Sequence, residues 1–455
     1  MTACFWPGVP MYDTVAQYGQ VLSNEVDDWH PPVMVRLWQL LRPLAPQGAP
    51  MFALQTALYA LGFGLLVAAL ARTARPKSAI AAAALGLSPL LLGWQMVVLK
   101  DAQMLGALVA AIGIAAHYRL QDRNIPLGTA AVMVLLIGYA TLVRANAVFA
   151  TAPLAALLLR RPLSIAVRGL AAVIAVVAVL AATPLIDHRL LGSARSEVAK
   201  TQPIFDLAAI AVSSPASPSV FTNAEREQIG RLHCVKAFFW DPLGDPTACS
   251  AATGRLMAAP ESDLYRALAA GVAAHPLAYA SHRLQHWNAT ERWLVQPGLP
   301  DAAPPIEAEP NDLGLETPPS ALAAGWQDVA AVEAASPLGW PVVWTVVSLC
   351  LLPIAWRRRS EPAGGLALAF IVSGLTLEAS FLIVSIASDL RYHLWPMLAA
   401  PLALIFLGDD LRAPRRQWII GAVLVIVVIA GGVIARSSLP RAPDSYQGMI
   451  DAATG

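Results

Sequence analysis

Charged side chains are scarce in this chain. Only 13% of its 455 residues are Asp, Glu, Lys or Arg, whereas soluble domains usually have about 25%. The 31 basic and 30 acidic residues leave a net charge of +1, so no nucleic acid partner is expected. Hydrophobic residues make up 57% of the chain, and the mean hydropathy is +0.57. The composition therefore excludes an ordinary soluble domain and indicates a multi-pass membrane protein.

Two other signals are missing. No glycine-rich loop follows a strand pattern, so no phosphate-binding loop for a nucleotide is expected. No internal repeat is visible, although inverted repeats are typical of secondary transporters.

Ten apolar runs predict the membrane helices, because a helix of roughly 17 to 25 residues crosses a hydrocarbon core of about 30 Å. The fifth run is the shortest. The expected spans are 51–71, 78–98, 102–118, 126–143, 147–159, 169–186, 338–356, 364–387, 392–408 and 418–435. The predicted fold class is an all-α polytopic membrane protein of about ten transmembrane helices, with an extracytoplasmic, mainly helical loop domain.

Basic residues occupy every second loop, and Lys and Arg near span ends are retained on the cytoplasmic side. The loops near 72–77, 119–123, 160–168, 357–359 and 412–416 are therefore expected in the cytoplasm. This threading divides the chain into an outward loop at 1–50 with juxtamembrane helices, six spans in 51–186, an outward loop domain at 187–337, four spans in 338–435 and an outward tail at 436–455.

The first loop would have to be exported without a preceding signal, because residues 1–10 form neither a signal peptide nor a span. We expect a further span upstream. The alternative is that the span at 51–71 carries the first loop across.

The outward segment 187–337 is expected to form short helices around 224–240, 261–272 and 276–293, followed by an irregular, proline-rich strap at 296–320. It contains Cys234 and Cys249, whose proximity suits a disulfide in an oxidising compartment. Cys4 and Cys350 are expected to be unpaired.

Four polar clusters fall on the outward face. The first combines Asp13 with the turn Asp27-Asp28-Trp29-His30-Pro31-Pro32. Asp13 could act as a general base on an acceptor or orient it, and the alternative is a solvated loop acid. The turn has oxygen and nitrogen ligands that suit a divalent metal, or it is an interfacial turn whose acids cap a helix.

The other three clusters are Lys100-Asp101, Arg144-Ala145-Asn146 and Asp389-Leu390-Arg391-Tyr392. Lysine holds a phosphate as a point charge, and arginine beside an amide can grip a phosphate. Each cluster also has a structural interpretation as a local ion pair or cap. Because ionisable groups at the edge of hydrocarbon are costly, four clusters on one face favour a shared anionic ligand.

His282 and His286 lie four residues apart on one helix face, but without a third ligand a zinc site is the weaker interpretation.

The order of these motifs resembles the GT-C superfamily of membrane glycosyltransferases, close to the family 39-type proteins of bacteria that use polyprenyl-phosphate sugars. The resemblance covers almost the whole chain. It implies that Asp13 matches the first-loop catalytic acid and Asp28-Trp29 the second motif, while Lys100 and Arg144 bind phosphate. Asp389-Arg391-Tyr392 corresponds to the late motif. The chain has Asp13-Thr14 where relatives often have Asp-Glu.

The resemblance implies an inverting transfer of a sugar from a polyprenyl-phosphate carrier to a lipid, glycan or protein acceptor, at the outer face of a bacterial inner membrane. The expected catalytic residues are Asp13 and Asp28. The expected substrate-binding residues are Trp29, His30, Lys100, Asp101, Arg144, Asn146, Asp389, Arg391 and Tyr392. No certain cofactor is implied, and a divalent metal stays an option. The alternative function is a transporter or flippase for an anionic lipid or solute.

Overall fold

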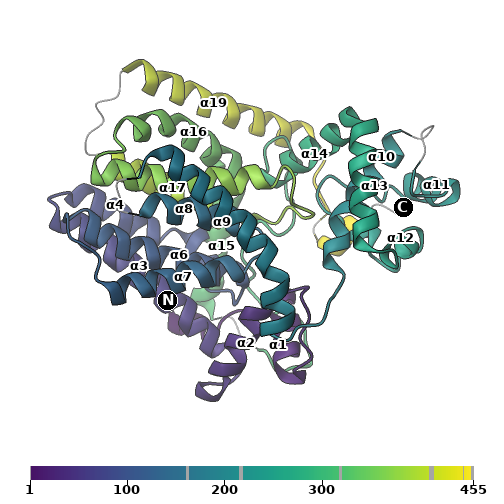
Figure 1. Cartoon of the computed structure of the whole chain (residues 1–455), viewed down its shortest axis with the longest axis horizontal. Coiled ribbons are helices and arrows are strands. Elements are labelled where there is room, and N and C mark those ends of the chain that lie inside the picture. The colour runs from purple at the N-terminus through teal and green to yellow at the C-terminus, as the bar shows by residue number, and fades with distance from the viewer. Residues whose placement is uncertain are drawn as a thin grey trace.

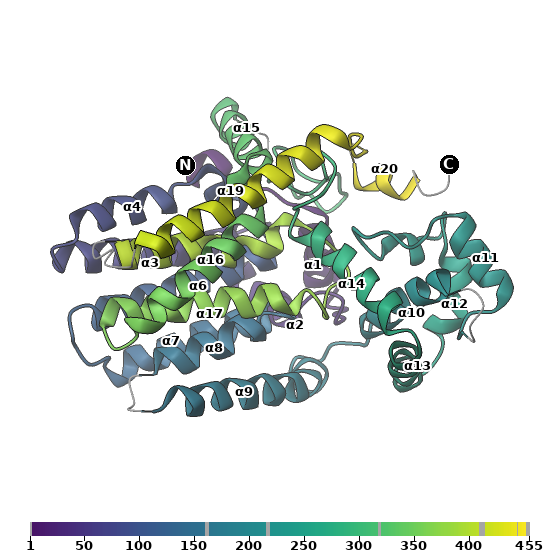
Figure 2. The same ribbon diagram turned by 90° about the horizontal axis from the view of Figure 1, so that it is seen from above.

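The computed structural model describes residues 2–159, 163–214, 219–316, 320–408, 415–443 and 445–451. These residues are predominantly helical and contain no strand beyond isolated bridges such as the one between Val9 and Val97. Figures 1 and 2 show a bundle of long helices with a smaller helical domain at one end. The all-helical class predicted from the sequence is confirmed. Arg160, Arg161 and Arg412, which contributed to the topology prediction, lie outside the described residues.

Apolar helices form the bundle. They are α3 (Ala49–Arg72), α4 (Pro76–Gly86), α5 (Pro89–Gln95), α6 (Lys100–Arg119), α7 (Leu127–Leu142), α8 (Val148–Leu158), α9 (Ile165–Leu185), α16 (Pro341–Arg357), α17 (Pro362–Ser380), α18 (Leu394–Gly408) and α19 (Arg415–Ser438). Among the described residues, five helical segments are long and apolar enough to cross a membrane. A sixth is added if α4 and α5 count as one span. The number of ten stays a prediction.

The expected span at 78–98 is broken, because α4 and α5 meet at an angle of 52°. The break falls at Leu87 and Ser88, just before Pro89, the first residue of α5. A proline at the first helical position fixes its own backbone and disfavours helical geometry in the residue before it. The last part of this predicted span, α5, is therefore redirected.

Helix α6 lies at the centre of the bundle, where its residues from Asp101 to Ala116 are all buried. It approaches α3 closely at Gly62 and Gly113, where an added Cβ would collide with the backbone of the opposite helix. Small residues permit this kind of backbone approach in membranes. In contrast, α9 and α19 expose most of their apolar surface, which suits contact with lipid. The bundle thus fixes the start of α6, where Lys100 and Asp101 stand.

The outer domain contains α10 (Thr201–Ser213), α11 (Asn223–Arg231), α12 (Ser250–Met257), α13 (Glu261–Ala274) and α14 (Pro276–Thr290) around its own hydrophobic core. A disulfide joins Cys234 to Cys249 within this core, and Cys4 and Cys350 are free. The short helix α20 (Tyr446–Asp451) also packs here. The helix expected at 224–240 ends at Arg231, and α12 was not expected.

The last part of the expected loop domain belongs to the bundle. Helix α15 (Ala321–Ala335) packs against α5. Its Glu333 accepts hydrogen bonds from the Ser88 hydroxyl and the Leu90 amide, at 2.8 and 2.9 Å. The core of the outer domain is therefore built mainly from residues before the strap, with α20 added from the tail. Helix α15, which follows the strap, belongs to the bundle. Helices α1 (Tyr12–Ser23) and α2 (Pro32–Leu41) cover the same end of the bundle that carries the outer domain (Figure 2).

Candidate functional site

Side chains from five separate segments meet at this covered end. Asp13 is the second residue of α1, and Lys100 begins α6. Arg144 lies between α7 and α8, and Asp389 and Arg391 stand just before α18. We call the connected group the central polar cluster; it consists of Tyr12, Asp13, His30, Lys100, Asp101, Arg144, Asn146, Asp389, Arg391 and Tyr392.

Asp13 is paired with two cations. Its Oδ2 lies 3.1 Å from Lys100 Nζ and 3.2 Å from Arg391 Nη2, and its side chain is almost fully buried. Burial by itself would raise the pKa of Asp13, but the charges of Arg391 and Lys100 outweigh it and lower that pKa well below its ordinary value. Asp13 is therefore a carboxylate at neutral pH. In this state it is a weak base, better suited to orienting a group than to removing its proton.

His30 lies beside both Lys100 and Asp13. Its Nδ1 lies 3.3 Å from Lys100 Nζ and 3.9 Å from Asp13 Oδ1. Burial, followed by the charge of Lys100, lowers the pKa of His30 to about 4. The ring is therefore neutral at pH 7, and Nδ1 can accept a hydrogen bond from the ammonium group. Lys100 keeps 16% of its side chain exposed, so this cation is held between two acceptors and still reachable.

Arg391 contacts three acidic side chains of the cluster. Its Nη2 donates to Asp389 Oδ2 at 2.8 Å and to the Tyr12 hydroxyl at 2.6 Å, and its Nε lies 3.7 Å from Asp101 Oδ2. Tyr12 in turn donates to Asp389 at 3.3 Å. Burial and the charge of Asp389 raise the pKa of Tyr12 well above its ordinary value, so the hydroxyl keeps its proton. The fully buried guanidinium therefore links three carboxylates.

Arg144 forms the second arm of the cluster. It is hydrogen-bonded to Asp101, and its Nε donates to Asn146 Oδ1 at 2.8 Å. Its guanidinium carbon lies 4.0 Å from the centre of the Tyr392 ring, a cation–π geometry. The amide and the ring hold the guanidinium plane in place. Three acids, Asp13, Asp101 and Asp389, face three cations, Lys100, Arg144 and Arg391, so the cluster is electrically balanced.

Two predicted site residues lie outside this cluster. Asp28 Oδ1 accepts hydrogen bonds from the Ser196 amide and hydroxyl, both at 2.6 Å, and its Oδ2 lies 3.5 Å from His188 Nε2. Trp29 is 41% exposed and lies beside Trp240. The turn therefore sends His30 toward Asp13, while Asp28 ties the first loop to the chain that follows α9.

Sequence reasoning missed several neighbours of the cluster. Burial, with the charge of Asp389, raises the pKa of Asp301 to about 7, and burial raises that of Asp241 to about 6. The backbone oxygen of Asp301 accepts from the Leu390 amide at 3.1 Å. Arg292 donates to the Ser388 carbonyl at 3.1 Å. Asp301 lies in the strap and Asp241 in the outer domain, and no spacing pattern links either to the spans. Among the cluster members that were not predicted, only Tyr12 could have been found from the sequence, because it directly precedes Asp13.

The other candidate clusters do not assemble a metal site. His282 Nε2 lies 3.3 Å from Asp206 Oδ1, and His286 Nδ1 lies 2.7 Å from the Ala237 carbonyl. Within the described part of the chain, no group of three or more His, Cys, Asp or Glu side chains could hold a metal ion. The zinc interpretation of His282 and His286 therefore gains no third ligand here.

The central polar cluster can bind an anion at Lys100, because this cation is partly exposed. An anion bound there would take Lys100 away from Asp13, and the Asp13 carboxylate could then bind a second ligand group. Asp101 Oδ2 lies 3.7 Å from Arg391 Nε and is buried without a hydrogen-bond partner among the described residues, so this carboxylate has acceptor capacity in reserve, whereas Asp13 Oδ2 is engaged by its two cations. Comparison with known protein families, curated proteins and solved structures finds no match for this chain.

Proposed function

We propose that the protein is a membrane glycosyltransferase of the GT-C type, which transfers a sugar from a polyprenyl-phosphate carrier to an acceptor. The observation that carries this proposal is the joint pairing of Asp13 with Lys100 and Arg391 at the covered end of the bundle. A carboxylate beside reachable and fixed cations is the arrangement that an acceptor and a departing phosphate both need.

In the proposed reaction, an acceptor oxygen or nitrogen attacks the anomeric carbon from the side opposite the phosphate. The bond between that carbon and the phosphate oxygen breaks, and its electron pair leaves with the lipid phosphate. Lys100 offsets the negative charge on the phosphate, and Arg144 supports it from the second arm. Asp13 orients the acceptor and takes its proton. The product has the inverted anomeric configuration.

The resting state of Asp13 fits this order of events. Lys100 and Arg391 hold its pKa low while the site has no phosphate. A phosphate that engages Lys100 would compete with Asp13 for the ammonium group and add negative charge nearby, which raises the basicity of the carboxylate. Donor binding would thereby activate the base.

We further propose ten spans, the cluster on the outer face of a bacterial inner membrane, and the outer domain above it. The basic loops at 72–77 and 357–359 support this orientation, because they lie at the opposite ends of their helices from the cluster. The substrate-binding group in this proposal is the central polar cluster. Asp28 and Trp29 have a supporting position at its border.

The test is transfer by the full chain in proteoliposomes, with radiolabelled decaprenyl-phosphate glucose, mannose and arabinose supplied in turn and membrane lipid extract as acceptor. Asp13→Asn should lose about 10²- to 10⁴-fold of the transfer rate. The matched control is Asp28→Asn, which should stay within a few-fold of the unsubstituted protein because Asp28 lies outside the cluster.

Full activity of Asp13→Asn would refute the assignment of the base. Movement of these lipids or of phosphate across the bilayer, without any transfer of label, would refute the glycosyltransferase and support the transporter.

A further inference from the structure

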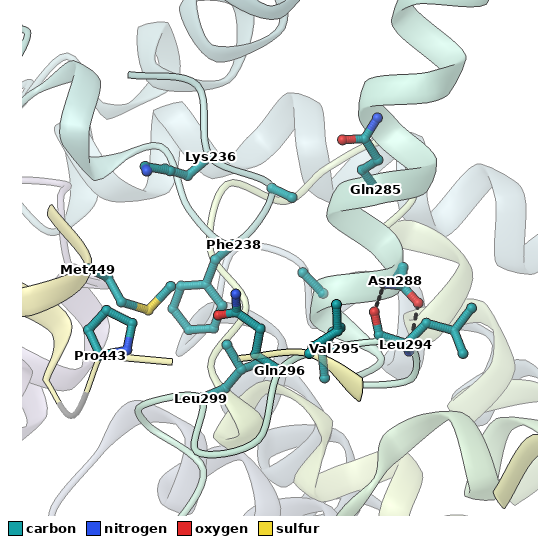
Figure 3. A pocket seen from close by; sticks show the side chains of 13 residues that line it. Lys236, Phe238, Gln285, Asn288, Leu294, Val295, Gln296, Leu299, Pro443 and Met449 are labelled. Carbon is teal, nitrogen blue, oxygen red and sulfur yellow. Dashed lines mark hydrogen bonds between the residues drawn. The ribbon is translucent and has the colours of Figure 1, made fainter. Parts of the chain in front are cut away.

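A cavity of about 560 Å³ lies beside the central polar cluster, between the outer domain and the chain that follows α19. Figure 3 shows side chains from three places converging on it: the segment with Lys236 and Phe238, the end of α14 with the turn at 294–299, and the tail with Pro443 and Met449. Its volume is in the range of ordinary ligand sites, about 300 to 1,000 Å³.

The walls of the cavity are mainly apolar. Phe238, Leu294, Val295, Leu299, Leu439 and Met449 belong to its lining. Leu294 and Leu439 are 45% and 42% exposed, so large aliphatic side chains stand at its edge without cover. Such a surface favours a hydrocarbon chain over water.

Tryptophan and arginine side chains lie beside the cavity, at the end of the apolar helix α19. Trp293 directly precedes the lining residue Leu294, and its indole donates to the Val428 carbonyl of α19 at 3.0 Å. Arg436, near the end of α19, lies 3.7 Å from the centre of the Trp340 ring. Tryptophan and arginine gather at the level of lipid head groups. Because α19 exposes most of its apolar surface, lipid chains have direct access to this edge.

Polar groups at the cavity have unused capacity. Among the described residues, neither the Lys236 ammonium nor the Gln296 amide has a hydrogen-bond or ion-pair partner in the fold. Partial burial lowers the pKa of Lys236 from its ordinary value, and among the described residues of the lining it is the only cation. A half-buried ammonium over apolar walls is suited to an anionic head group.

A shared aromatic wall connects the cavity to the central polar cluster. The Phe238 ring lies 6.3 Å from the Tyr446 ring, and Tyr446 lies 6.5 Å from Tyr12 of the cluster. The guanidinium of Arg292 is 6.0 Å from the Phe238 ring and donates to the carbonyl of Ser388, next to Asp389. A molecule in the cavity is therefore separated from the cluster by Phe238 and, behind it, by Tyr446 and Arg292.

We propose that this cavity binds an anionic phospholipid from the outer leaflet, with its acyl chain against the apolar walls and its phosphate at Lys236. This lipid is the acceptor of the transfer, a statement that rests on the proposed function. The hydroxyl groups of its head would then face Phe238, and for transfer the wall of Phe238 and Tyr446 must open, because these rings separate the head group from the cluster. The membrane thus supplies an acceptor that enters from the side of α19.

The binding experiment uses phosphatidylglycerol with a diazirine on one acyl chain, in nanodiscs of phosphatidylcholine that hold the full chain. After illumination, mass spectrometry should find the label on peptides that contain Leu294 and Leu439. Phosphatidylcholine with the same diazirine should label these peptides about tenfold less, because it lacks net negative charge.

Lys236→Gln should reduce phosphatidylglycerol labelling about tenfold, and Lys236→Arg should retain it. Arg231→Gln, at an exposed position on α11 of the same domain, is the matched control and should leave labelling unchanged. Val295→Phe, which fills a wall, should reduce labelling by both lipids. Equal labelling by both lipids, absence of label from the cavity, or full labelling of Lys236→Gln would each overturn the lipid site.

Two readouts separate this inference from the proposed function. Asp13→Asn should still be labelled in the cavity, because binding there needs no chemistry. If labelling follows the pattern above but no donor supports transfer, the glycosyltransferase and the acceptor role fail together, and the lipid site stands. If transfer occurs and Lys236→Gln leaves the KM for phosphatidylglycerol unchanged, the acceptor role alone is overturned.

Discussion

Two buried clusters in this molecule have the same residue types and different construction. In the outer domain, Asp206 accepts from Arg283 at 2.7 Å and from Gln202 at 2.9 Å, with His282 at 3.3 Å. In the central polar cluster, Asp13 likewise faces an arginine and a histidine. An aspartate, an arginine and a histidine together therefore do not define a function.

The two clusters differ in which chain segments supply the partners of the aspartate and in whether a partner is exposed to solvent. Asp206 and its three partners belong to α10 and α14 of one domain, and Arg283 spends its second Nη on the Ser385 carbonyl at 2.7 Å. The partners of Asp13 come from separate segments of the chain, and Lys100 is partly exposed. The Asp206 cluster therefore fastens the domain to the loop before α18, while the central polar cluster can exchange a partner for a ligand.

The largest expected effect is on the exposed cation of the central polar cluster. Lys100→Gln should lower the transfer rate by about 10²- to 10³-fold, because it removes a charge that stabilises the departing phosphate. Thermal unfolding in detergent should change little, since Arg391 remains to pair with Asp13. A variant that unfolds readily but transfers normally when folded would make Lys100 a structural residue like Arg283.

The reverse pattern is expected in the outer domain. Asp206→Ala should destabilise the protein by roughly 3 to 5 kcal/mol, because it leaves a buried arginine without its carboxylate. Unfolding in detergent, followed by circular dichroism, measures this change. The folded fraction should transfer sugar at nearly the normal rate. A loss of transfer without loss of stability would erase the contrast between the clusters.

The disulfide tests whether the two regions are stabilised separately. Replacing both Cys234 and Cys249 by Ser should cost about 3 kcal/mol for a loop of this length. We expect the loss to appear first as faster proteolysis of the outer domain. Simultaneous cleavage within the buried helix α6 would show that the bundle and the outer domain unfold as one unit.

The smallest effect is a change in pH dependence near the central polar cluster. The pKa of Asp301 is raised from 3.8 to about 7 by burial and by Asp389, opposed by Arg391 and Arg292. The folded protein therefore binds this proton more tightly than the unfolded chain, and stability should fall as pH rises from about 4 to about 7. In Asp301→Asn this decline should be smaller. Identical pH profiles of unfolding for the two proteins would contradict it.

Much of the fold was predictable from composition. Apolar runs of sufficient length form helices in lipid, because backbone groups must bond within their own segment. The break at Leu87 follows from Ser88-Pro89, because the residue before a proline disfavours helical geometry. The packing of α15 on the bundle was not predictable, because a helix rich in alanine fits many neighbours. Two bonds to the distant Glu333 decide its position.

For the candidate site, the sequence supplied most of the members and none of the contacts. Lys100 and Arg144 were candidates because they stand on the face where the positive-inside rule disfavours them. Asp28 and His30 lie in one turn, yet backbone direction sends only His30 to Asp13. Asp301 could not be found, because its raised pKa arises from burial beside Asp389, far away in the chain.

The sequence by itself determined that this chain forms apolar helices and that its scarce polar groups gather near helix ends, because hydrocarbon tolerates no unpaired charge in a span. Only the tertiary structure decided which of those groups meet. Helix packing brings Lys100 Nζ and Arg391 Nη2 to 3.1 and 3.2 Å from Asp13 Oδ2 and leaves Asp28 aside. Ion pairing acts over such short distances, and the positions that set them are fixed by contacts between segments remote in the chain.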